Sequence, residues 1–155
     1  MTIPTPDPNA LRTTFSFSPP VDDAAAWNLN LDDFANRILQ AFPGAGTSPQ
    51  GPMGPRGADT LSFEVPLGGG IWLEGLAATP FPGMGSVMAI TASADEAAVL
   101  ARWLRDTVAP APDLVCFTSE HALDLGETEY ERIPAHGDVH DIAQVLQAHI
   151  ESVRA

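Results

Sequence analysis

The sequence contains a single cysteine, Cys116, and no lysine, so that arginine supplies every basic side chain. One thiol excludes an internal disulfide framework and every zinc site built from several cysteines. No apolar run approaches the roughly 20 residues that a membrane-spanning helix needs. The first ten residues have neither the basic start nor the apolar stretch of a secretory signal. We therefore expect a cytoplasmic protein that does not insert into a membrane.

The charge of the chain is strongly one-sided. Twenty Asp and Glu residues stand against seven arginines, which gives a formal net charge of −13 over 155 residues. A field of this sign opposes binding to nucleic acid phosphates and to anionic membranes, and it favours solubility and rapid capture of a basic partner. With 45% hydrophobic residues, the chain can still build the core of one domain.

The apolar spacing predicts an α+β domain with a mainly antiparallel sheet, in the element order β-α-β-β-β-α-β-β-α. We expect strands at 11–18, 61–65, 71–76, 86–91, 114–118 and 127–133, and helices at 31–42, 93–109 and 138–150. Helix N-caps are predicted at Asn30, Ser93 and Asp138, and Ser93 with Glu96 has the spacing of a capping box.

Two segments lack such periodicity. Residues 1–10 carry three prolines and are predicted to be a disordered tail. Residues 43–58 contain GPMGPRG and are predicted to be a flexible Gly/Pro loop within a single domain at 11–155. Between the first strand and the first helix, Trp27 is expected to reach the core.

The candidates for metal and cofactor chemistry are few. His136 and His140 are four residues apart with Asp138 between them, a spacing that on one helix could hold a divalent ion. If Asp138 caps the helix, however, His136 lies outside it, so we expect no metal site. Gly68-Gly69-Gly70 lacks the continuation of a phosphate-binding loop and is interpreted as a hairpin turn. We expect no cofactor.

The sequence contains no complete motif for nucleophilic catalysis either. Ser119, Glu120 and His121 are consecutive, and side chains of adjacent strand residues point to opposite faces, so these three cannot form a relay by themselves. Cys116 lies in an apolar run and is predicted to be a buried core residue rather than a reactive thiol. His149, on the apolar face of the last helix, is interpreted as a histidine at the edge of the core. We therefore expect no enzyme.

Acidic residues concentrate near the C-terminus. Between Glu120 and Asp141 the chain has seven carboxylates and one arginine, Arg132. If 127–133 is a strand, its three glutamates share one face about 6.8 Å apart, since antiparallel strands rise ~3.4 Å per residue. The row fits either an edge strand protected by charge or a docking strip for a basic groove. The predicted partner-binding residues are Glu120, Asp124, Glu127, Glu129, Tyr130, Glu131, Asp138 and Asp141.

Element order, size and acidity together resemble the small acidic α+β immunity proteins that bacteria encode beside polymorphic toxins. The resemblance spans residues 11–150 and rests on the FANRILQAFPGA helix, the SADEAAVLARWLRDTV helix followed by LVCFTSE, and the closing amphipathic helix. It implies a non-enzymatic inhibitor, a monomer or weak dimer, that blocks one cognate toxin domain of basic character. It implies the class alone and no individual binding residue.

Two alternatives remain open. Without its first strand, the element order is similar to that of type III secretion chaperones, which are small acidic dimers. A small enzyme or ligand-binding domain would instead use Glu120, His121 or the histidines at 136 and 140. A chaperone predicts an obligate dimer with apolar grooves, and an enzyme predicts a concave pocket that gathers His121 with other titratable groups.

Overall fold

The computed structural model describes residues 12–53, 58–81, 83–127 and 129–154. Within these ranges one antiparallel sheet has the strand order β2-β3-β4-β5-β1-β6-β7, which confirms the predicted α+β class. The strands are β1 Thr13–Ser18, β2 Gly46–Met53, β3 Ala58–Gly68, β4 Ile71–Phe81, β5 Met84–Ala92, β6 Cys116–Ser119 and β7 Glu131–Arg132. The helices are α1 Leu31–Ala41, α2 Ala94–Trp103, α3 Glu120–Asp124 and α4 Val139–Arg154. A 3-10 turn, η1, spans Val21–Asp23, and a π-helical turn, η2, spans Leu104–Val108.

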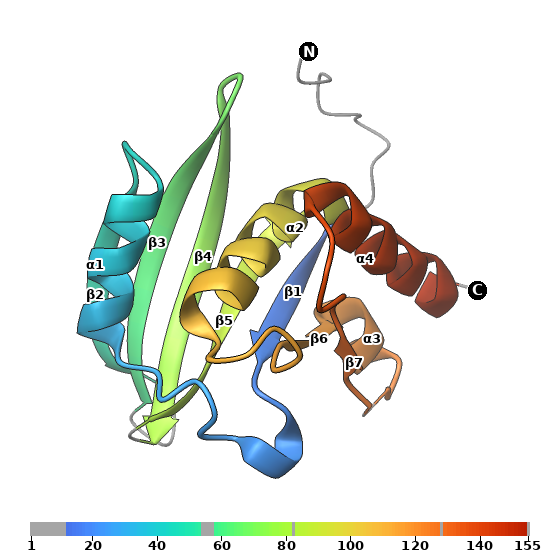
Figure 1. Cartoon of the computed structure of the whole chain (residues 1–155), viewed down its shortest axis with the longest axis horizontal. Coiled ribbons are helices and arrows are strands. Elements are labelled where there is room, and N and C mark those ends of the chain that lie inside the picture. The colour runs from blue at the N-terminus through green and yellow to red at the C-terminus, as the bar shows by residue number, and fades with distance from the viewer. Residues whose placement is uncertain (1–11, 54–57, 82, 128, 155) are drawn as a thin grey trace.

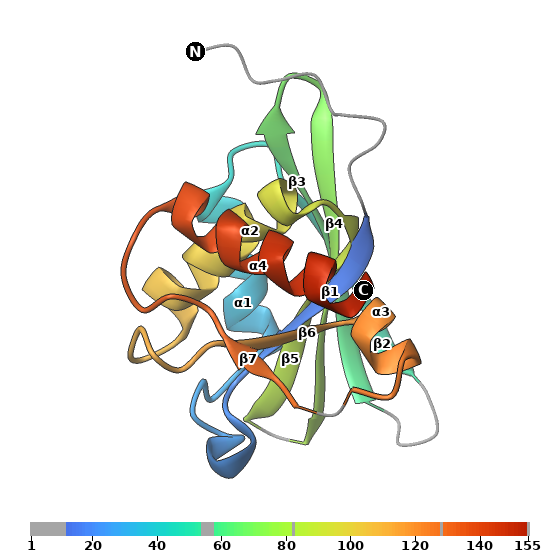
Figure 2. The same cartoon turned by 90° about the vertical axis from the view of Figure 1, so that its right-hand side faces the viewer.

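Helices α1, α2 and α4 lie on one face of the sheet (Figures 1 and 2). Alternate strand residues point toward this helical layer, as the pleat of a strand requires. In β3, for example, Leu61, Phe63 and Val65 are buried, whereas Glu64 between them is exposed on the other face. The core therefore forms between the helices and one face of the sheet, while the opposite face carries no helix of the described residues.

The first strand occupies an interior position in the sheet. β1 pairs antiparallel with β5 on one side and with β6 on the other. Its Phe15 and Phe17 are fully buried, and Phe17 packs against Phe117 of β6 with ring centroids 6.5 Å apart. The strand thus joins the β2–β5 meander to the C-terminal elements, where the candidate site lies.

Trp27 reaches the core as predicted. Its side chain is 5% exposed, and its indole N–H donates a 2.6 Å hydrogen bond to the carbonyl of Leu114, just before β6. A buried indole needs such an acceptor, because an unpaired N–H inside a protein is costly. The bond fixes the connection between β1 and α1 against the segment that precedes β6.

The flexible loop predicted at 43–58 is wrong over most of its length. Gly46–Met53 forms β2, the edge strand that pairs antiparallel with β3. Prolines are tolerated at this position, because an edge strand needs ladder hydrogen bonds on one side only, and the register shifts between Pro49 and Gly51. The tail predicted at 1–10 and residues 54–57 of the loop lie outside the described residues.

The strand predicted at 127–133 is also wrong in most of its extent. Of the described residues in this range, only Glu131 and Arg132 form strand pairs with β6, and a short helix, α3, comes between the two strands. Of the two hydrogen bonds of the capping box predicted at α2, only the one to the Ser93 side chain forms. The Ser93 hydroxyl accepts the Glu96 N–H at 3.2 Å, but the Glu96 carboxylate binds the Arg12 guanidinium with two 2.8 Å contacts instead of returning to the cap.

Candidate functional site

The chain leaves the sheet after Ser119 at the end of β6 and returns at Glu131, the start of β7. We call residues 120–127 and 129–130 the β6–β7 segment; residue 128 lies outside the described residues. It contains α3 and most of the residues that the sequence singled out for partner binding. Figure 2 shows α3 at the margin of the sheet, near the C-terminal end of α4.

Local signals fold the first part of this segment. The Ser119 hydroxyl caps α3 by accepting the N–H of Ala122 at 3.1 Å. At the other end Gly126 has φ +84°, the left-handed conformation that favours glycine. Its N–H donates to Leu123 O and the Glu127 N–H donates to Ala122 O, both at 3.0 Å, which is the Schellman pattern of a helix end.

The segment exposes apolar side chains between its charges. Leu123, Leu125 and Tyr130 are 48%, 59% and 39% exposed, and they make up half of the large hydrophobic side chains that are exposed in the described chain. Exposed carboxylates lie among them, and none has an ion pair or hydrogen bond to another described side chain; they are Glu120, Asp124, Glu127 and Glu129. The surface therefore combines apolar anchors with unneutralised negative charge.

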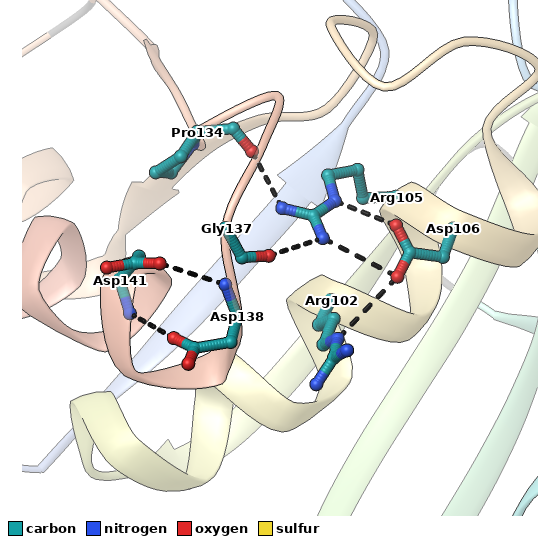
Figure 3. Close-up of polar contacts among 7 residues, drawn as sticks. All are labelled: Arg102, Arg105, Asp106, Pro134, Gly137, Asp138 and Asp141. Atoms are coloured by element: carbon teal, nitrogen blue, oxygen red, sulfur yellow. Dashed lines mark hydrogen bonds and ion pairs between the residues drawn. The ribbon is translucent and has the colours of Figure 1, made fainter.

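Three of the predicted binding carboxylates are instead engaged within the protein. Glu131 binds the imidazole of His149 on α4. Asp138 and Asp141 form a reciprocal box at the start of α4: the Asp141 carboxylate accepts the Asp138 N–H at 2.9 Å, and Asp138 accepts the Asp141 N–H at 3.1 Å (Figure 3). That N–H lowers the pKa of the Asp138 carboxyl. The N-cap predicted at Asp138 is confirmed, while the predicted row of three glutamates on one strand is not formed.

Ser119, His149 and Glu131 form a hydrogen-bonded chain that the sequence reasoning missed. The Ser119 Oγ lies 2.9 Å from His149 Nε2, and His149 Nδ1 contacts a carboxylate oxygen of Glu131. The order hydroxyl, imidazole, carboxylate is that of a serine-hydrolase triad. The three residues come from β6, α4 and β7, and only the pairing of those elements brings them together.

Ser119 lacks the accessibility that the serine of a hydrolase triad has. Its side chain is fully buried, and its oxygen already accepts the N–H of Ala122. A substrate carbonyl must approach such an oxygen closely for attack, and Ser119 does not line the hollows at Glu64, at His121 or at Trp27. The arrangement links β6, α4 and β7 within the protein. His149 is buried at 5% exposure, in agreement with its predicted place at the edge of the core.

The arginines whose side chains the structure describes are all engaged by the protein itself. Arg105, on the π-helical turn η2, is 7% exposed and donates to Asp106 at 2.8 Å, to Pro134 O at 3.1 Å and to Gly137 O at 2.8 Å (Figure 3). This hydrogen bond from Arg105 lowers the pKa of the Asp106 carboxyl. The other arginines with described side chains bind as follows: Arg12 to Glu96, Arg37 to Asp33, Arg102 to Asp106, and Arg132 to the carbonyl of Asp113.

A polar hollow of about 360 Å³ lies beside α3. It is lined by Arg12, Thr13, Thr14, Thr91, Glu120, His121 and Asp124. The Thr13 hydroxyl accepts the backbone N–H of His121 at 3.4 Å, and Thr91 has φ +46°, an outlier for a β-branched residue. The hollow gathers His121 with other titratable groups, as the enzyme alternative predicts, although the Arg12 guanidinium is held by Glu96.

The remaining candidates from the sequence have structural positions. His136 is exposed outside α4, and His140 contacts the Gln144 amide at 3.1 Å; the described residues contain no group of three side chains able to hold a metal ion. Cys116 is buried as predicted, and burial raises the pKa of its thiol. The hairpin turn predicted at 68–70 is confirmed between β3 and β4.

Comparison with protein-family models, curated proteins and solved structures finds no match, so the geometry of this chain carries the argument about function. No helix within the described ranges is long and apolar enough to cross a membrane.

Proposed function

We propose that this chain is a non-enzymatic protein-binding module of the bacterial cytoplasm, an immunity protein that neutralises a cognate toxin by covering a basic surface on it. The observation that carries this proposal is the combination of exposed apolar side chains and carboxylates on the β6–β7 segment. Tyr130 is of a residue type that often carries much of the binding energy of a protein interface, and the exposed Leu123 and Leu125 add apolar contact area beside it. The exposed carboxylates around them, which have no ion pair with a described residue, supply charge of the sign that a basic partner requires.

The distribution of arginine supports the same proposal. Each arginine with a described side chain is held by a carboxylate or a backbone carbonyl of the same chain. The net charge of −13 is therefore left to act on the surroundings. A field of this kind accelerates association with an oppositely charged protein and makes the association rate sensitive to salt.

The experiment is co-expression and pull-down with the product of the adjacent gene, followed by binding kinetics on the purified pair. A 1:1 complex that abolishes a toxic activity is expected. The absence of a complex contradicts the proposal, and in that case a dimer by light scattering supports the chaperone alternative.

Two double variants then test which surface binds. Leu123→Ala/Leu125→Ala is expected to speed dissociation, because it removes apolar anchors from the interface. Glu127→Gln/Glu129→Gln is expected to slow association and to reduce its dependence on salt. Leu39→Ala is the matched apolar control, since Leu39 is 43% exposed on α1 and lies outside the segment. Equal effects of Leu39→Ala and the leucine pair would place the interface elsewhere.

A second candidate, a small enzyme or ligand-binding domain, is favoured by the hollow at His121. The side chains of Glu120 and Asp124 give this hollow a negative lining that suits a small cationic ligand. Thermal-shift assays with small cationic compounds test this, with His121→Ala and Asp124→Asn as variants. Stabilisation that both variants abolish, in a chain that binds no toxin, would favour this candidate over the immunity protein.

A further inference from the structure

We propose that His149 is the positioning residue that holds the β6–β7 segment in the shape that it presents to a partner, an inference that rests on the proposed function. The two ring nitrogens of His149 bind the residues that flank the segment on either side. Nε2 contacts Ser119, the residue before it, and Nδ1 contacts Glu131, the residue after it. One buried side chain of α4 therefore closes both ends of a loop of Ω-loop size.

The hydrogen bonds of this clamp form a consistent chain of donors and acceptors. An ionised Glu131 can only accept, so the shared proton of that contact belongs to Nδ1 of His149. In the neutral imidazole Nε2 is then the acceptor for the Ser119 hydroxyl, whose oxygen in turn accepts the N–H of Ala122. Through this chain the imidazole supports the first turn of α3 as well as the return of the backbone to β7.

The clamp is anchored in the rigid part of the molecule. The imidazole packs edge-on against Phe117, with ring centroids 5.1 Å apart, and Phe117 is fully buried. Ile142, Leu146 and Ile150, on the same face of α4 as His149, are buried in the core. The anchor therefore belongs to the core while the segment that it holds is exposed, an arrangement suited to presenting a preformed surface.

A preformed segment binds more tightly than a flexible one, because fewer side chains and backbone angles must be ordered when the partner arrives. Loss of the clamp is therefore expected to leave the fold intact and to loosen residues 120–130. The local stability of this segment, and not that of the whole domain, is the quantity that His149 controls.

The experiment is amide hydrogen exchange on the full chain, read at Leu125, Gly126 and Glu127, whose N–H groups bond within the segment. In Glu131→Ala and in His149→Phe these amides are expected to exchange at least about tenfold faster, while the amides of β3 and β4 keep their rates. Glu131→Gln is expected to restore most of the protection, since its amide oxygen can accept from Nδ1.

Matched controls separate the clamp from general effects. Glu129→Ala removes a nearby exposed carboxylate that has no partner among the described residues, and His140→Phe changes an exposed histidine of the same helix. Neither is expected to alter exchange in the segment. Glu131→Ala changes a side chain that is 52% exposed, so it keeps the test informative if His149→Phe does not fold.

Unchanged exchange at the three reporter amides in Glu131→Ala would overturn the inference, and so would acceleration spread evenly over the sheet. This readout needs no partner, so it is independent of the immunity function. If the exchange result holds and the leucine pair Leu123→Ala/Leu125→Ala leaves toxin binding intact, the clamp is retained and the proposed docking surface is rejected.

Discussion

Glu64 of β3 and Glu74 of β4 lie directly opposite each other in the sheet, with their side chains on the face away from the buried Leu61, Phe63 and Val65. Both side chains are exposed, and neither has an ion pair or hydrogen bond with a described residue. They line a hollow of about 430 Å³ together with Ile90 and Ser62. Like charges directly opposite on an antiparallel pair repel each other, so this pair costs the fold some stability.

Replacing one member of this pair by a cation should stabilise the domain. We expect Glu64→Lys to raise the free energy of unfolding by roughly 0.2–1 kcal/mol, because a cross-strand attraction replaces a repulsion. Urea denaturation at low salt measures the change, and added salt should reduce it. Glu129→Lys, at an exposed glutamate outside the helices and strands, serves as the control; an equal gain there would assign the effect to net charge and not to the cross-strand pair.

Arg105 and Arg102 offer a comparison between a buried and an exposed arginine on neighbouring turns of α2 and η2. Arg105→Met should lower the free energy of unfolding by roughly 2–4 kcal/mol, because the carbonyls of Pro134 and Gly137 lose their donor in a buried place. Arg102→Met should cost below about 0.5 kcal/mol, the usual scale of an exposed ion pair on a helix. Chemical denaturation of both variants tests this, and equal losses would contradict the structural role assigned to Arg105.

The close contact of Phe63 with Gly75 leads to a packing prediction. A Cβ at Gly75 would lie 2.0 Å from Cζ of Phe63, whose ring also packs edge-on against Phe34 at 5.4 Å. Gly75→Ala should therefore cost roughly 1–3 kcal/mol, the scale of overpacking in a core.

Thermal or urea unfolding measures that cost. Gly46→Ala is the control, since the nearest atom to a Cβ there is an oxygen of the flexible Glu64 side chain at 3.4 Å. The double variant Gly75→Ala/Phe63→Leu should recover part of the loss, because the smaller side chain gives the new methyl group room. If the loss of the double variant equalled the sum of the losses of Gly75→Ala and Phe63→Leu, the contact between the new methyl group and Phe63 would not be the cause of the destabilisation.

Asp106 is expected to contribute to the pH dependence of the free energy of unfolding. The hydrogen bond from Arg105 lowers the pKa of this carboxyl in the folded state. A depressed folded-state pKa contributes stability that is present above the unfolded value, about 3.9 for Asp, and that is lost as the pH falls through the folded value. Asp106→Asn should therefore be less stable than the unmodified protein at pH 7, and the difference should shrink toward pH 3.

Denaturation midpoints of the two proteins at each pH measure this difference. Acidification also neutralises the other carboxylates and relieves their mutual repulsion, so the difference at each pH, and not the absolute stability, is the informative quantity. Asp113→Asn is the control, an exposed aspartate whose side chain has no contact among the described residues. A difference that stays constant from pH 7 to pH 3 would contradict the role of Asp106.

Local rules account for the parts of the fold that the sequence predicted correctly. Asn30 caps α1 by accepting the Asp33 N–H at 2.9 Å, and Ser93 and Asp138 cap α2 and α4, since a cap needs only residues three positions apart. The burial of Cys116 and the turn at 68–70 likewise follow from short stretches of sequence. The same local reasoning failed at 43–58, where pairing with β3 outweighs the turn-forming tendency of Pro and Gly.

For the candidate site, too, some features follow from the sequence and others depend on the tertiary structure. The sequence by itself determined that residues 120–130 are acidic, because composition does not depend on the fold. Only the tertiary structure decided which carboxylates remain available: Glu131 is bound by His149, 18 positions away, and Glu96 by Arg12, 84 positions away. Such pairs form where β1, β6, β7 and α4 meet, and neither propensity nor periodicity encodes the meeting of elements so distant in the chain.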